Sequence, residues 1–123
     1  MSDFQRFRNA VYFWSEHLGL LDWEIHVEEA VLKKAHADNI ALVHPNWQQH
    51  LALVLWNKRN KNIIGTPEEI ALHEVLHILL AAHAGLAAAA GTTEHVAVDA
   101  EEHAIIKRLM HVLQHYKESR YGS

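Results

Sequence analysis

The stretch that begins at Thr66 constrains the fold most, because it combines a well-specified helix start with apolar residues on every side. Thr66 is a good N-cap, Pro67 suits the first helical position, and Glu69 completes a capping box. The apolar residues that follow leave no polar face, which is typical of a buried central helix. We therefore predict a helix that runs to about His83 and ends at Gly85.

Two histidines and a glutamate interrupt this apolar helix, in the order His73-Glu74-x-x-His77. Residues four apart lie about 40° apart around a helix axis, so His73 and His77 can point at one metal ion with Glu74 beside them. Unpartnered polar groups in a buried helix are costly, and a metal ion would be their partner. The alternative is a pair of core histidines bonded to backbone or carboxylate groups. The pattern is typical of Zn²⁺ sites in which the glutamate is the general base, and we predict that chemistry here.

A hydrolytic zinc ion usually has three protein ligands and one water molecule. The chain has no cysteine, so the third ligand is His, Asp or Glu. We favour Glu102, because it falls within the apolar stripe of a predicted last helix, where a buried carboxylate needs a counter-charge. The alternatives are Glu101, His95, His103 and His83. His83 is less favoured, because on a continuous helix it points about 120° away from His77.

Apolar periodicity predicts an α+β fold. The expected helices and strands, besides the one already described, are a helix over Phe4–Leu18, strands over Trp23–Glu28, Ile40–Val43 and His50–Trp56, and a helix over Glu94–Tyr116. Apolar side chains on both faces of the third strand indicate that both faces are covered. Asn57 to Asn62 is expected to be a solvated polar connection.

Length and charge exclude several classes of protein. A chain of 123 residues is long enough for one domain, residues 1–123, and too short for two. The net charge of −4 gives no basic footprint for nucleic acid. There is no apolar run of membrane-spanning length and no signal-peptide apolar region at the start. We therefore expect a cytoplasmic protein, and the sequence makes no prediction of its oligomeric state.

Three segments carry a resemblance to a known family: LGLLDWEIHV, TPEEIALHEVLHILL and EEHAIIKRLMHVL. Their order and spacing resemble small zinc metallopeptidases of phages and prophages, which look like minimal gluzincins. The resemblance implies a zincin-like fold with a leading helix, a twisted sheet of three or four strands, an active-site helix and a C-terminal helix. It also implies a location in a bacterial host's cytoplasm. By analogy with zincins, an extended peptide would pair with the sheet's edge, for which we nominate His50–Trp56.

The predicted function is therefore zinc-dependent hydrolysis of a peptide or protein substrate, with Glu74 as general base and His73, His77 and Glu102 as ligands. One alternative is a non-catalytic zinc-binding domain of the same fold. Another is a metal-dependent endoribonuclease that uses His73, His77 and His83, whose spacing resembles that of the bacterial rRNA-maturation endoribonucleases. The acidic net charge argues against that alternative, and so does Leu80, which stands where those enzymes have a glycine.

Overall fold

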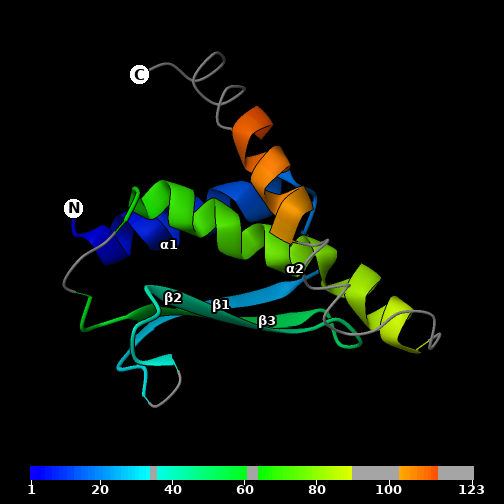
Figure 1. Ribbon diagram of the computed structural model, residues 1–123, viewed down its shortest axis with the longest axis horizontal. Coiled ribbons are helices and arrows are strands. Elements are labelled where there is room, and N and C mark those ends of the chain that lie inside the picture. The colour runs from blue at the N-terminus through cyan, green and yellow to red at the C-terminus, as the bar shows by residue number, and fades with distance from the viewer. Residues whose placement is uncertain (34–35, 61–63, 90–102, 114–123) are drawn as a thin grey trace.

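Two helices pack over one face of a three-stranded sheet, and a further helical segment lies against the second of them (Figure 1). The computed structural model describes residues 1–33, 36–60, 64–89 and 103–113, and of residues 82–89 it describes the backbone alone. The elements are α1 (Asp3–His17), β1 (Glu24–Ala30), β2 (Ala41–Asn46), β3 (Leu51–Asn57) and α2 (Pro67–Ala89), and residues 103–113 are also helical. The predicted α+β class is thus confirmed.

Helix α1 begins and ends through local chemistry that the sequence makes visible. Ser2 and Gln5 form a reciprocal capping box, with the Gln5 N–H donating to the Ser2 hydroxyl at 3.1 Å. At the other end, Gly19 has a φ of 78°, and the N–H of Leu20 donates to the carbonyl of Ser15 at 2.8 Å. This is the Schellman arrangement, in which a glycine takes the left-handed position that a side chain disfavours.

The sheet has the order β1-β3-β2, with β3 antiparallel to β2 and parallel to β1. The prediction that His50–Trp56 forms the edge is therefore wrong, because β3 is the central strand and β1 and β2 are the edges. The prediction that both faces of β3 are covered holds for one face only. Of its two faces, that of Ala52, Val54 and Trp56 is buried, whereas the leucine face is only half-buried.

Helix α2 does not stop at Gly85 as predicted but continues to Ala89. The physical reason is that strong helix formers flank this glycine, Ala84 before it and Leu86 to Ala89 after it, and the penalty for one interior glycine is only about 1 kcal/mol. The start of the helix agrees with the prediction, since the N–H of Glu69 donates to the Thr66 hydroxyl at 3.1 Å. Among the described residues, no helix is long and apolar enough to cross a membrane.

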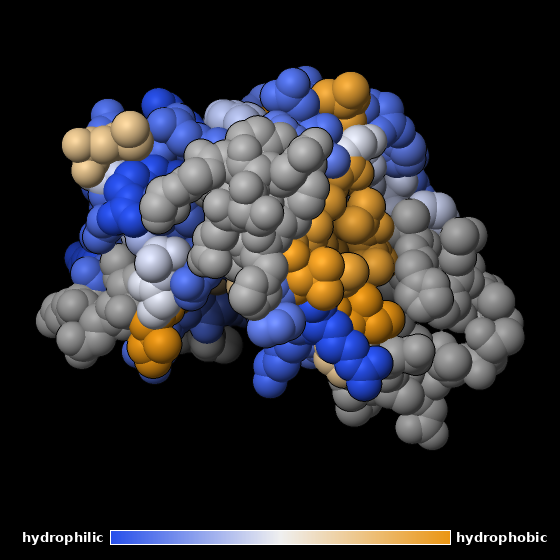
Figure 2. Space-filling model, turned by 90° about the horizontal axis from the view of Figure 1, so that it is seen from above, coloured by the Kyte–Doolittle hydropathy of each residue, from blue (hydrophilic) through white to orange (hydrophobic). Residues whose placement is uncertain are grey.

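The core lies between α1, α2 and the inner face of the sheet. Phe7 and Trp14 of α1 are fully buried, and the ring of Phe7 lies 4.8 Å from that of Trp56. From α2 the core takes Leu72, Val75, Leu76 and Ile78, and from the last helical segment it takes Ile106. Seen from the helical side, the surface carries an apolar band between polar regions (Figure 2).

Asn57, predicted to belong to a solvated connection, is instead a buried residue at the end of β3. Its side-chain amide donates to the carbonyls of Ala37 at 3.0 Å and Asn39 at 2.9 Å. Its side-chain oxygen accepts from the N–H of Arg59 at 3.1 Å. One carboxamide therefore holds the chain that enters β2 against the chain that leaves β3.

We predict that Asn57→Ala lowers the free energy of unfolding by about 2 kcal/mol, because two carbonyls lose their donor in a largely buried place. Urea denaturation followed by circular dichroism measures the change. The matched control is Asn46→Ala, whose side chain bonds only within an exposed turn, to Gln49. We expect that variant to change stability by less than about 0.5 kcal/mol. Equal effects in the two variants would contradict the anchoring role of Asn57.

Candidate metal centre

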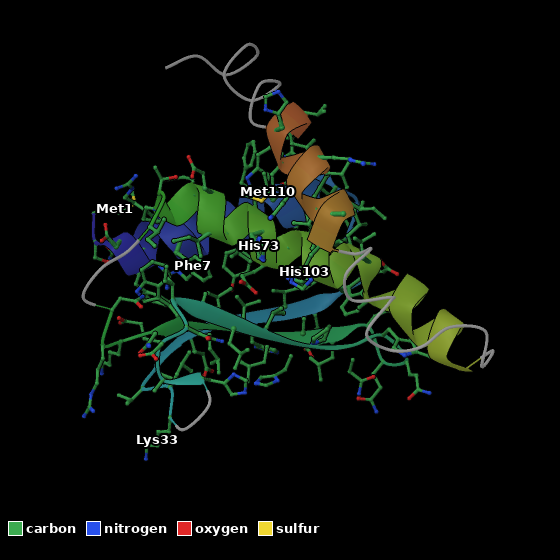
Figure 3. All side chains as sticks on the ribbon, viewed as in Figure 1. Met1, Phe7, Lys33, His73, His103 and Met110 are labelled. Carbon is green, nitrogen blue, oxygen red and sulfur yellow. The ribbon has the colours of Figure 1, made fainter. Side chains whose placement is uncertain are left out.

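Three histidines from two helical segments meet where residues 103–113 pass over α2 (Figure 3). His73 and His77 lie one turn apart on α2 and are partly buried. His103 is exposed and begins the last described helical segment. That segment is fixed against the core by Ile106, one turn further on, which is fully buried. Packing by an apolar neighbour thus brings a third imidazole to the two on α2.

The ring nitrogens are close enough to share one ion. The Nε2 atoms of His73 and His77 lie 3.2 Å apart, and the ring of His103 lies 4.9 Å from that of His77 and 6.1 Å from that of His73. One nitrogen from each of the three lies within 4.8 Å of the others. Two nitrogens that bind one tetrahedral zinc ion are about 3.3 Å apart, as its usual bond lengths require. The pair on α2 already has this spacing, and the cluster can hold a metal ion.

The surroundings of His73 keep its imidazole neutral. Burial, the largest cause, acts together with electrostatic repulsion from His77, His103 and Lys107 to lower the pKa of His73 to about 4. A group with a pKa of about 4 is deprotonated at neutral pH, so a lone pair is available. Metal binding requires neutral imidazole, so His73 needs to lose no proton before it binds an ion.

Glu74 lies beside the cluster and is 9% exposed. Burial raises the pKa of its carboxyl group to about 7. Within the described part of the chain, this carboxylate has no hydrogen-bond or ion-pair partner. A buried acid without a partner lowers the stability of the folded protein. Stability alone therefore does not explain why a glutamate is present at this position.

Two cavities meet at His73 and Glu74. One, of about 420 Å³, is lined by all three histidines and by Ala41, Leu42, Val43 and Pro45 of β2. The other, of about 430 Å³, lies toward the start of α2 and is lined there by Glu69 and Ile70. Asn39 and Ala41 line both. The edge strand β2 and the segment before it therefore form one wall that runs past the histidine cluster.

The structure brings together three of the residues that the sequence singles out for the site, His73, Glu74 and His77, and adds His103, one of the alternatives. Glu102, the favoured third ligand, lies outside the described residues, as do Glu101 and His95. For His83 only the backbone is described, within the unbroken helix.

Sequence reasoning ranked His103 low because it assigned the apolar stripe to Glu102. A signal for His103 was nevertheless present. It lies three residues before Ile106 and seven before Met110, a spacing that places all three on one helix face. Ile106 is buried in the core and Met110 lines a cavity beside the cluster. No sequence pattern of this kind predicts that β2 lines the cavity, because that depends on which strand lies at the edge of the sheet.

The chain matches none of the protein-family models, curated proteins or solved structures with which it was compared.

Proposed function

We propose that the protein is a zinc-dependent peptidase whose metal site is built on His73 and His77, with Glu74 as general base. The observation that carries the proposal is a combination of two features: three imidazole nitrogens, one from each histidine, lie within 4.8 Å of one another, and beside them is a buried carboxylate that has no partner among the described residues. The third ligand comes from the start of the last helical segment. One candidate is His103, whose position beside His73 and His77 supports it. The other is its sequence neighbour Glu102, which the apolar pattern of the sequence favours.

The donor set fits zinc. Imidazole nitrogens suit a divalent ion of intermediate softness, and three protein ligands leave a fourth position open, as in catalytic rather than structural sites. The cavity of about 420 Å³ at the cluster gives a substrate access to that position. Zinc in such a site supplies Lewis acidity, which brings the pKa of water toward neutrality and polarises a carbonyl group.

Glu74 would move the proton. Its carboxylate oxygen accepts a proton from the attacking water, whose oxygen then forms the new bond to the carbonyl carbon. When the carbon–nitrogen bond breaks, the same carboxyl group returns the proton to the leaving amine. Because Glu74 lines both cavities, it can reach a peptide that lies across their junction.

An extended substrate has a backbone partner in β2. As an edge strand, β2 has one row of backbone groups outside the sheet, and its residues line the cavity that contains the histidines. A peptide added along this edge would gain main-chain hydrogen bonds and pass over the cluster. This replaces β3, which the sequence nominated, with the strand that the topology leaves open.

We predict that His77→Ala weakens Zn²⁺ binding by more than the roughly 10–100-fold that loss of an outer-shell partner costs a metal site. Calorimetric titration of the metal-free protein with Zn²⁺ measures the affinity. His26→Ala is the matched control, because His26 is an exposed histidine of β1 that lies outside the cluster. Unchanged affinity in His77→Ala, or an equal loss in His26→Ala, would exclude the site.

The third ligand can be decided by a pair of variants. We predict that His103→Ala weakens Zn²⁺ binding more than Glu102→Ala does, because the His103 ring already lies with the other two. The same titration provides the measurement, with circular dichroism to show that each variant keeps its helices. A larger loss in Glu102→Ala would instead restore the ligand set that the sequence favours.

We predict that Glu74→Gln retains zinc but reduces peptide hydrolysis by about 10²–10⁴-fold, the usual contribution of a general base. The variant keeps the size of the side chain and removes the proton acceptor. Cleavage of a fluorogenic peptide library by the zinc-loaded protein is the assay, with metal content measured in parallel. If the wild-type protein binds zinc and cleaves no peptide, the non-catalytic zinc-binding alternative holds instead.

A further inference from the structure

We propose that the cavity beside Glu69 is a subsite for a long basic side chain, lysine or arginine, next to the bond to be cleaved. The inference rests on the peptidase proposed above and adds the class of substrate. The cavity has a volume of about 430 Å³, within the ~300–1,000 Å³ of typical ligand sites. It opens onto His73 and Glu74, so a side chain that enters it belongs to a residue lying at the candidate centre.

The apolar walls of the cavity suit the methylene groups of a lysine or arginine side chain. Four large apolar side chains line the cavity, from four separate parts of the chain: Ile40, Ile64, Ile70 and Met110. Ile64 is 85% exposed, which leaves it free to contact a ligand. Met110 has an unbranched, flexible side chain that adapts to different shapes. Lysine and arginine bury their stems along such surfaces while the charged end remains with polar groups.

The polar end of the cavity is acidic. Asp38 and Glu69 line this cavity and not the neighbouring one, which contains His77 and His103. Glu69 lies one turn before His73 on α2, about 6 Å away along the helix axis. Within the described residues, neither carboxylate forms an ion pair. A four-carbon stem that enters beside His73 can therefore place its ammonium group at two carboxylates that have no counter-charge.

The segment that carries Asp38 is fixed in place. The carbonyls on both sides of it, those of Ala37 and Asn39, accept hydrogen bonds from the buried Asn57 side chain. The carbonyl of Ile40 accepts from the side chain of Asn60 at 3.1 Å. A wall that is already ordered does not lose further conformational entropy when a ligand binds, which favours selective binding.

The buried carboxylate of Glu74 is a second, independent sign that this cavity receives a ligand. It is 9% exposed, lines the cavity and has no partner among the described residues. The negative charge of the lining comes from Asp38 and Glu69. An acidic ligand side chain would be repelled, and an uncharged one would leave the carboxylates uncompensated.

The two methionines of the chain provide the reporter. Met110 lines this cavity, whereas Met1 lines a separate cavity with Arg6 and Phe13. In protein labelled with ¹³C at the methionine methyl groups, we titrate the N-acetyl methylamides of lysine, norleucine and glutamate. Norleucine has the stem of lysine without its charge. We expect lysine to shift the Met110 signal and leave the Met1 signal in place, and to bind about threefold to fivefold more tightly than norleucine.

The charge dependence is tested in the double variant Asp38→Asn, Glu69→Gln, in which we expect lysine and norleucine to bind equally. The control is Glu24→Gln, Glu28→Gln, which removes two exposed carboxylates of β1 and should keep the preference. The subsite is overturned if lysine leaves the Met110 signal unmoved. It is also overturned if norleucine or glutamate binds as tightly as lysine, or if the double variant keeps the preference.

This binding measurement separates the two proposals. Selective lysine binding without cleavage of any lysine-containing peptide by the zinc-loaded protein would leave the subsite standing and reject the peptidase. Cleavage without preference for lysine or arginine beside the scissile bond would leave the peptidase standing and reject the subsite.

Discussion

The structure depends on the burial of α2 between α1, the sheet and the last helical segment. Leu72, Val75, Leu76 and Ile78 are all fully buried, so apolar contacts fix the rotation of this helix about its axis. Each such side chain contributes roughly 1.5–3 kcal/mol by leaving water. The direction in which His73 and His77 point is then a consequence of the packing of the core.

The same burial explains why the site lies at the edge strand β2 rather than over the centre of the sheet. The inner face of β3 is covered by the helices, and the polar residues of α2 face the wall that begins at Asn39 and continues along β2. Two neighbouring cavities with different linings result. His73 and Glu74 line both cavities, whereas His77 and His103 line only one, and Asp38 and Glu69 line only the other. The position of a ligand's charge therefore decides where it fits.

How much of this could be predicted from the sequence differs between local and long-range features. The start of α2 at Thr66, the end of α1 at Gly19 and the three strands are set by neighbouring residues, and the predictions for them hold. The end of α2 was missed because Gly85 was judged by its own propensity and not by the alanines around it. The central position of β3 and the anchoring by Asn57 depend on pairings between distant residues, which periodicity does not reveal. For the third metal ligand, Glu102 and His103 are sequence neighbours, and a pattern of apolar residues cannot choose between them.

The central place of β3 has a consequence for how the chain acquires its fold during synthesis. Among the described strands, β1 and β2 each pair only with β3, which is the last of the three in sequence. Before residue 57 leaves the ribosome, β1 and β2 have no neighbour, and the leading helix lacks most of its packing surface. The β2–β3 hairpin can form as soon as its turn is made, whereas the parallel pairing of β1 requires closure of a longer loop. Assembly of the sheet therefore waits for β3, and the imidazoles on α2 leave the ribosome only after all three strands have done so.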